Sequence, residues 1–280
     1  MEILKFNLSG KTAFFKKPDV NTYRTLSYGQ IHKIAILGMF GAIIGLNSYA
    51  QQGDDDYPEF YEKLKDIKVG IVPLDKNTQL NKDVVNTGCF KRSIQKFNNS
   101  VGYASQEEGG NLIVTEQWIE DVSWDIYLMC DSDISKKIKD YITNKSSVYI
   151  PFLGKNDHVA NISRVELFDS NKVSVNQDEK LVLNSFFDKK MFDIEDTTII
   201  SGRGGLRSSH SLEKKVLYRE YLPYELDREF NQYISKLFVF TNKRVSILND
   251  DALIYNIDGK KIFFLLDFRW LLSKTTIFLL

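Results

Sequence analysis

Apolar and polar residues alternate near the N-terminus. Leu4, Phe6 and Leu8 alternate with Lys5 and Asn7. A period of two is typical of a strand that buries one face. This segment is therefore expected to be the first strand of a sheet.

A second pattern predicts a buried helix. Residues 34–46 form a nearly uncharged apolar run of 13 residues, which is shorter than the roughly 20 residues that a membrane span needs. Ser27 and Gln30 match the S-x-x-Q capping box, which places the start of the helix there. The run contains three glycines, and each costs about 1 kcal/mol relative to alanine in a helix interior. They predict close packing of the helix against a sheet.

The middle of the chain continues in short elements. The pattern predicts a strand over residues 67–74, a polar excursion of 37 residues over 75–111, strands over 112–116 and 124–130, and a helix around Ile134, Ile138 and Ile142. An excursion of this length favours a protruding hairpin or a partly disordered arm. The order of elements is compatible with an elaborated ferredoxin-like α+β sandwich.

The remainder of the chain is predicted to be rich in strands. Short strands are expected over residues 162–168, 172–175, 181–187, 215–221 and 237–241. We therefore divide the chain into a ferredoxin-like domain, 1–157, with its arm at 75–111, and a smaller β-rich region, 158–280.

Charge is balanced overall and uneven locally. The 280 residues include 37 Lys and Arg and 37 Asp and Glu, so net charge alone indicates no polyanionic partner. Residues 1–33 nevertheless carry six basic residues against two acidic ones, 86–100 carry three against none, and 199–215 carry four against one. Residues 51–66 hold six acids against two lysines. A single run of this kind is most simply a solvated surface.

Few residues suit metal or covalent chemistry. Cys89 and Cys130 lack the spacing of a zinc site or a disulfide framework, and no P-loop, Rossmann, H-E-x-x-H or G-x-S-x-G motif is present. We therefore expect no metal and no cofactor. The N-terminus lacks a signal-peptide pattern. The two cysteines fit the reducing environment of the cytoplasm, and we expect no membrane partner.

The basic runs favour RNA as a partner. They lie among aromatic residues or in a segment rich in Gly and Ser, and a single-stranded nucleic acid site combines cations for phosphates with rings for bases. Tyr28, His32 and Lys33 are close enough in sequence to be considered for metal-independent RNA cleavage. A capped helix start explains the same three residues.

Residues 6–46 resemble the N-terminus of the CRISPR-associated Cas five family of the RAMP superfamily, as found in type I-B systems. The resemblance is carried by Phe15-Lys16-Lys17-Pro18, by the segment Thr22–Tyr28 and by the glycine-punctuated helix ILGMFGAIIGL. Two later segments, 149–155 with Ala160 and 220–223 leading to 238–241, are also similar. The likeness extends over roughly residues 1–263.

The resemblance implies a non-catalytic, RNA-binding subunit of a Cascade ribonucleoprotein complex in antiviral defence. Such a subunit caps the 5′ handle of the guide crRNA and contacts a backbone subunit of the Cas seven family and a large subunit of the Cas eight family. Target DNA is met through the complex. The implied RNA-binding residues are Lys11, Phe15, Lys16, Lys17, Tyr23, Arg24 and Tyr28, with Lys91, Arg92 and Lys96 on the arm and, on charge alone, Arg203 and Arg207.

The resemblance also leaves one alternative open. In type I-C systems this family is itself the endoribonuclease that processes pre-crRNA, with a Tyr, Lys and His set in which Lys and His are adjacent. Here the only such pair is the reversed His32-Lys33. The sequence also departs from the family at an apolar tail, residues 265–280, to which it assigns no role.

Overall fold

The first unit of the protein is a helix-covered antiparallel sheet. The computed structural model describes residues 2–19, 24–76, 85–98, 106, 113–169, 171–176, 178–195 and 214–265. Its first elements are β1 (Ile3–Ala13), α1 (Lys33–Ile44), η1 (Tyr49–Gln51), α2 (Glu59–Leu64), β2 (Val69–Pro73), β3 (Lys91–Asn98), β4 (Ile113–Met129), α4 (Asp133–Thr143) and β5 (Asn161–Phe168). The strand order is β2-β4-β1-β5 with every neighbour antiparallel. Together with the helices α1 and α4, this is the βαββαβ arrangement of a ferredoxin-like fold, so the predicted α+β class is confirmed.

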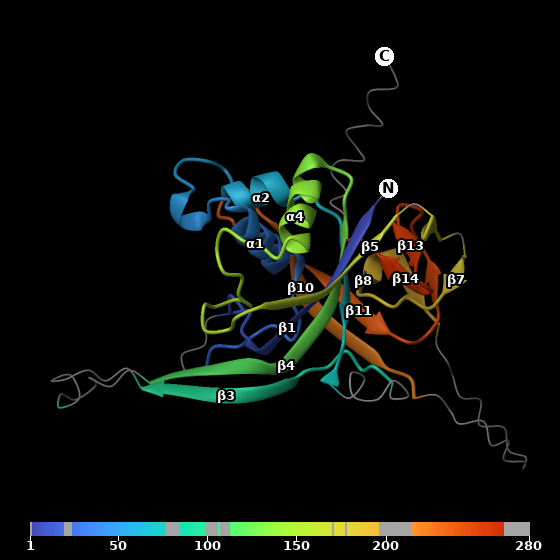
Figure 1. Cartoon of the computed structure of the whole chain (residues 1–280). Helices are drawn as coiled ribbons and strands as arrows, with labels where there is room; N and C mark the ends of the chain where they lie inside the picture. The colour runs from blue at the N-terminus through green and yellow to red at the C-terminus, as the bar shows by residue number, and fades with distance from the viewer. Residues whose placement is uncertain are drawn as a thin grey trace, which may run out of the picture.

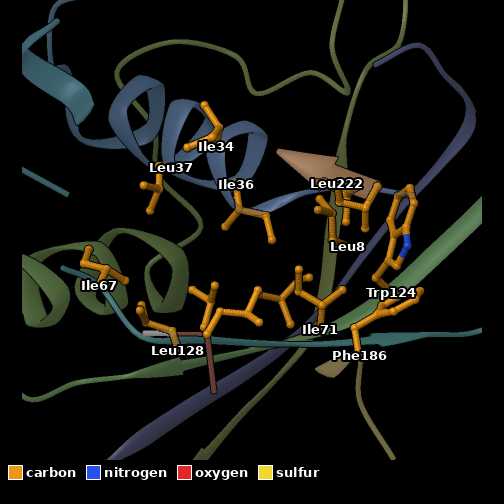
Figure 2. Packing of buried hydrophobic residues seen from close by; sticks show 14 of the residues in the cluster. Leu8, Ile34, Ile36, Leu37, Ile67, Ile71, Trp124, Leu128, Phe186 and Leu222 are labelled. Carbon is orange, nitrogen blue, oxygen red and sulfur yellow. The ribbon is translucent and has the colours of Figure 1, made fainter. Parts of the chain in front are cut away.

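The core lies between this sheet and the helices (Figures 1 and 2). Leu8 of β1 pairs in register with Trp124 of β4, and both are fully buried. Ile36 of α1 and Phe186 from the β-rich region join the same cluster. Burial of one such side chain stabilises a protein by about 1.5–3 kcal/mol. The two regions therefore share one continuous core.

The start of α1 differs from the sequence prediction. The helix begins after His32, whose Nδ1 accepts the backbone N–H of Ala35 at 3.2 Å. Gln30 does not cap the helix, because its side-chain oxygen accepts the indole N–H of Trp124 at 2.8 Å. The predicted capping box at Ser27 and Gln30 is therefore wrong. Trp124, on a strand distant in sequence, binds the side-chain amide of Gln30 that a capping box would use at the helix start.

The glycines of α1 serve contact with a helix instead of a sheet. A Cβ added at Gly41 would lie 2.7 Å from the Cβ of Phe60 on α2, and one at Gly38 would lie 3.9 Å from the same ring. Gly45 ends α1 in the left-handed conformation, with φ of 79°, which glycine adopts without strain. The expected close packing exists, but its partner is α2.

The predicted excursion over residues 75–111 contains a protruding hairpin strand. β3 pairs with the first half of β4, from Lys91 opposite Glu120 to Asn98 opposite Ile113. These two strands extend away from the helices as a long arm (Figure 1). β4 is one continuous strand where the pattern predicted two, so it serves both the arm and the central sheet. Residues 77–84 and most of 99–112 lie outside the described part of the chain.

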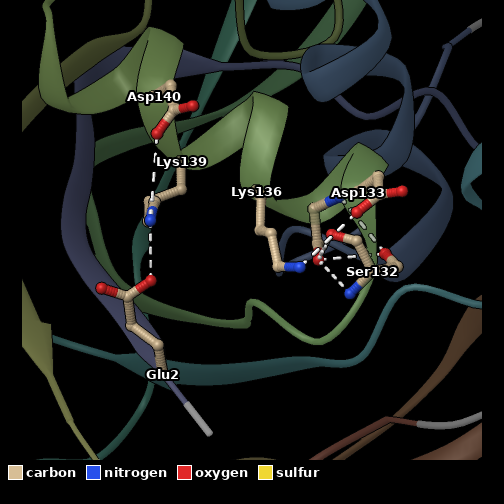
Figure 3. Close-up of polar contacts among 7 residues, drawn as sticks. Glu2, Ser132, Asp133, Lys136, Lys139 and Asp140 are labelled. Carbon is tan, nitrogen blue, oxygen red and sulfur yellow. Dashed lines mark hydrogen bonds and ion pairs between the residues drawn. The ribbon is translucent and has the colours of Figure 1, made fainter.

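Polar contacts cap α4 and link it to the start of β1 (Figure 3). Ser132 caps the helix by accepting the backbone N–H of Ser135, a typical N-cap arrangement. Lys139 donates to the carboxylate of Glu2 at 2.7 Å, which links the helix to the start of β1. The predicted helix around Ile134, Ile138 and Ile142 is thus confirmed.

Within its described residues, the β-rich region forms antiparallel strands in three small sheets. Its elements are β6 (Val173–Val175), β7 (Lys180–Leu181), β8 (Phe187–Asp188), η3 (Lys189–Met191), β9 (Phe192–Ile194), β10 (Leu217–Leu226), β11 (Tyr233–Thr241), β12 (Val245–Ile247), β13 (Ile254–Ile257) and β14 (Lys260–Phe263). The sheets have the orders β10-β11-β8, β7-β12-β9 and β14-β13-β6. The single strand predicted over 181–187 is instead two strands in different sheets.

The central sheet of the ferredoxin-like unit crosses the expected boundary between the two regions. β5 begins at Asn161, beyond the expected boundary at 157, yet it pairs with β1. The ferredoxin-like sheet therefore extends to Phe168, and the domain division itself stays a prediction. Leu265 bridges to Val69 of β2, and residues 266–280 of the apolar tail lie outside the described part.

Two findings concern membrane-spanning helices and metal sites. Within the described ranges, no helix is long and apolar enough to cross a membrane. The same ranges contain no group of three or more His, Cys, Asp or Glu side chains placed to hold a metal ion.

Candidate nucleic-acid interface

Two basic runs that are distant in sequence meet in one extended sheet. We define the N-terminal loop as residues 14–32. Within it, the N–H of Lys17 bonds the carbonyl of Leu26 at 2.8 Å. Thr25 then donates to the carbonyl of Thr115 at 2.8 Å and accepts the N–H of Gln117 at 2.9 Å. Because Thr115 and Gln117 lie on β4, the loop continues the sheet of the arm on the edge opposite β3.

The side chains of β3 divide its cations between two faces of the arm. Successive residues of a strand point to opposite faces, so Arg92 and Lys96 share one face with Ile94, while Lys91 is on the other. Lys91 is paired with Glu120 at 2.8 Å, and this carboxylate raises the pKa of the ammonium. In the described part of the chain, neither Arg92 nor Lys96 forms an ion pair. Their face is therefore the more cationic one.

The N-terminal loop adds cations of differing availability. Lys16 and Arg24 on the loop are exposed, as is Lys11 near the end of β1. Lys17 is more constrained, because its ammonium lies 3.4 Å from the Glu220 carboxylate and 5.1 Å from the centre of the Tyr28 ring. Lys17 thus helps to hold the loop in place.

The predicted stacking rings of the loop are buried. Phe15 is 3% exposed and packs against His32 and Trp124 at 5.8 and 6.1 Å between ring centres. Tyr28 is 5% exposed, and burial raises the pKa of its hydroxyl to about 12. A buried ring offers no free face to a base, so their predicted stacking role is corrected. The apolar area of each ring stabilises the core instead.

Three other candidate residues lie outside the described part of the chain, whereas the nearby ring of Phe97 is described. Tyr23, Arg203 and Arg207 lie outside the described residues. Phe97 on β3 is 38% exposed, and its ring lies 5.7 Å from that of Trp118 on β4. Because alternate residues of β3 share a face, Phe97 is an accessible ring on the face that carries Lys91, opposite Arg92 and Lys96.

The structure adds Lys155, which the sequence interpretation missed as a site residue. Its ammonium contacts both carboxylate oxygens of Glu116, at 3.0 and 3.1 Å. It also lies 5.4 Å from the ring centre of Phe14 and 6.0 Å from that of Phe97. Lys155 therefore joins the base of the arm to the end of β1. No local motif signals this, since Lys155 and Glu116 are 39 residues apart.

The three residues considered for RNA cleavage do not converge. The rings of Tyr28 and His32 are 5.4 Å apart, but the ammonium of Lys33 donates to the carbonyl of Lys65 at 2.7 Å and faces the Tyr224 ring. Burial lowers the pKa of His32 to about 3, so the imidazole is neutral near pH 7. Its Nδ1 accepts a helix N–H, which leaves only Nε2 to carry the proton.

A carboxylate from the β-rich region anchors the loop. Glu220 on β10 accepts the hydroxyl of Tyr218 at 2.6 Å as well as the backbone N–H of Gly29. Burial raises the pKa of Tyr218, so the hydroxyl stays protonated and acts as the donor. The basic loop is thus held by the arm on one side and by β10 on the other.

Comparisons with known proteins find likeness at low identity. No protein-family model matches the chain, and no curated protein matches it. A chain of a "CRISPR RNA-guided surveillance complex" is 10% identical, with 88% of this chain and 91% of that chain covered and a TM-score of 0.46. A CRISPR protein from Archaeoglobus fulgidus is 12% identical, with 94% and 98% covered and a TM-score of 0.44. A chain of a type III-B Cmr-beta complex bound to target RNA is 10% identical, with 88% and 86% covered and a TM-score of 0.45. Likeness at this level assigns neither a family nor a function to the chain.

Proposed function

We propose that the protein is a non-catalytic, RNA-binding subunit of a type I CRISPR surveillance complex, of subtype I-B, that binds the 5′ handle of the guide crRNA in the cytoplasm. The observation that carries the proposal is the backbone pairing of Thr25 with β4. That pairing joins the basic N-terminal loop and the basic face of the arm into one sheet. The subtype, the handle and the partner subunits come from the sequence resemblance.

The geometry suits an extended strand of RNA. Exposed Lys16 and Arg24 lie on the loop, and exposed Arg92 and Lys96 lie on the arm that the loop extends. A single strand needs cations spaced along its backbone, with accessible rings for its bases. Phe97 provides such a ring on the opposite face of the arm, beside the ammonium of Lys155. The arm would also reach the adjoining backbone subunit, as the resemblance implies.

Binding without cleavage is supported by the arrangement around α1. His32 is occupied as the helix cap and Lys33 is bound to the end of α2. Neither side chain is placed to activate a 2′-hydroxyl together with Tyr28. The alternative, a metal-independent endoribonuclease, therefore receives less support from the geometry than from the sequence.

The test is a titration of the purified protein with its cognate repeat RNA, in EDTA, over a range of salt concentrations. Lys16→Glu with Lys96→Glu, one from each basic run, is expected to weaken binding and to flatten the salt dependence by about 0.7 in log-log slope per lost phosphate contact. Lys172→Glu with Lys190→Glu, both exposed on the β-rich region, is the matched control.

Two results would contradict the proposal. An unchanged affinity and salt slope in the Lys16 and Lys96 variant would remove the proposed RNA surface. Specific cleavage of the repeat RNA, abolished by His32→Ala, would overturn the non-catalytic role and favour the endoribonuclease.

A further inference from the structure

A cavity of about 710 Å³ lies between the C-terminal ends of α1 and α4 and the edge strand β5. Ligand pockets of proteins have volumes of roughly 300–1,000 Å³, so the cavity has the size of a binding site. Aliphatic side chains from all three elements line it, among them Ile43, Ile142 and Leu167. The cavity shares no residue with the proposed RNA surface.

A β-bulge turns successive residues of β5 toward this cavity. Neighbours in a regular strand point to opposite faces, yet Ser163, Arg164 and Val165 all line the cavity. The register with β1 shifts at this point, so that Arg164 and Val165 both lie opposite Phe6. Bulges at sheet edges re-aim side chains beside functional sites. Here the bulge places a cation in the lining of the cavity.

Two cations of the lining, Lys145 and Arg164, have a backbone conformation that such residues disfavour. Their φ angles are 52° and 50°, in the left-handed region that is costly for most L-residues. The other non-glycine residues with positive φ in the described part of the chain are all Asp or Asn, which tolerate this region. Strained residues of this kind gather at functional sites. Two strained cations in one cavity therefore indicate that their charge has a use there.

The protein supplies no counter-charge to these two cations. No Asp or Glu lines the cavity, and within the described ranges neither Lys145 nor Arg164 forms an ion pair. Glu166, the next acid along β5, is bound to Lys5 at 3.1 Å. The two cations are therefore available to an anion from outside the chain.

The helix ends do not require the cations either. A lysine near the C-terminus of a helix can bind its last carbonyls. In α4, however, the carbonyls of Tyr141 and Ile142 accept the backbone N–H groups of Ser146 and Lys145, at 2.9 and 3.1 Å. The last turn of α1 is likewise bound by backbone N–H groups of the loop that follows α4. Helix capping thus leaves the ammonium of Lys145 without a task.

We propose that this cavity binds an aliphatic molecule with an anionic head group, a carboxylate or a phosphate. The head group would lie between Lys145 and Arg164, with the hydroxyls of Ser147 and Ser163 as further donors, and the body would contact the aliphatic side chains. No aromatic residue lines the cavity among the residues that the structure describes, so a nucleobase would find no ring to stack on. This inference goes beyond RNA binding and does not depend on it.

The test is isothermal titration of the full-length protein with octanoate, octyl phosphate and octanol, each below the concentration at which it forms aggregates. We expect an anion to bind, and the tighter of the two identifies the head group. Octanol keeps the body without the charge and should bind about tenfold more weakly or less. Each methylene removed from the body should weaken binding by about fourfold, because burial of one methylene contributes that factor.

Glycine substitutions separate the charge from the fold. Lys145→Gly with Arg164→Gly removes both cations and suits the left-handed backbone. We therefore expect binding weakened by about tenfold or more, with a midpoint of thermal unfolding at least as high as that of wild type. Lys145→Asn with Arg164→Asn, which also tolerates positive φ, is a second variant with the same loss of charge.

Asp258→Gly is the matched control for these variants. Asp258 also has a positive φ, of 48°, and lies in the turn between β13 and β14, outside the lining of the cavity. Its substitution tests the effect of glycine in a left-handed position without loss of a cavity cation. Binding should therefore be unchanged.

Four results would overturn the proposal. They are the absence of binding by both anions, octanol binding as tightly as the anions, equal affinity in wild type and the glycine variant, and displacement of the anion by single-stranded RNA. The last would identify a nucleic acid site. Because none of these assays requires the repeat RNA, their failure is separate from failure of the RNA-binding role.

Discussion

Glu220 accepts the backbone N–H of Gly29 through both carboxylate oxygens, at 3.1 Å to Oε1 and 3.0 Å to Oε2. The two residues are 191 positions apart. Their contact fixes the N-terminal loop against β10 and so sets the position of the loop's cations.

Loss of this anchor is predicted to weaken RNA binding through the loop. Glu220→Ala leaves the Gly29 N–H without its acceptor, which costs about 1–3 kcal/mol in a partly buried site. We expect faster hydrogen exchange at Gly29 and weaker RNA binding, whereas Glu220→Gln, which keeps an acceptor oxygen, should retain part of both. Equal RNA affinity in wild type and Glu220→Ala would show that the anchor does not organise the binding surface.

The two faces of the arm are predicted to respond differently to charge reversal. Arg92→Glu should reduce RNA affinity strongly, because that face lacks a described carboxylate partner. Lys91→Glu should have a smaller effect, because its cation is already paired with Glu120. Affinities measured side by side at one salt concentration decide this, and a larger effect at Lys91 would assign RNA to the opposite face.

Two glycines of α1 are predicted to respond oppositely to alanine. Gly41→Ala places a Cβ 2.7 Å from the Cβ of Phe60, and overpacking of this kind costs about 1–3 kcal/mol. Gly38→Ala meets only an ordinary contact at 3.9 Å and should gain up to about 1 kcal/mol from helix propensity. Urea unfolding of both variants checks the pair. Equal free energies of unfolding would show that α1 and α2 adjust freely.

Acid is predicted to destabilise the protein through His32. Burial lowers the folded-state pKa of His32 from 6.5 to about 3. Between these two pH values, the unfolded chain therefore binds a proton that the folded chain does not bind. Stability is fully present above pH 6.5 and falls as the pH drops toward 3, by up to about 1.4 kcal/mol per pH unit. Burial also lowers the pKa of His158, which acts in the same direction.

The variant His32→Asn isolates this contribution. Asparagine is a good N-cap and does not titrate in this range, so its free energy of unfolding should fall less between pH 6.5 and 5 than that of wild type. Parallel pH profiles for the two proteins would mean that His32 protonates without unfolding.

Local patterns predicted most of the elements of the ferredoxin-like unit. The alternation around Leu4 and the fourfold spacing around Ile138 each depend on neighbours within one element, and β1 and α4 follow them. The capping box at Ser27 failed for the same reason, because a local motif takes no account of a distant partner such as Trp124. The polar excursion correctly indicated an arm, since its composition suits no buried element.

The sequence by itself determined the α+β class, the presence of β1, β2 and α4 in the first unit, and the basic runs on which the RNA-binding proposal rests. Only the tertiary structure decided that Phe15 and Tyr28 belong to the core, that Thr25 joins the loop to the arm, and that Glu220 holds the loop. The physical reason is distance along the chain. Periodicity records which face of an element is buried, whereas pairing and burial of loop residues depend on strands that folding brings together from far away.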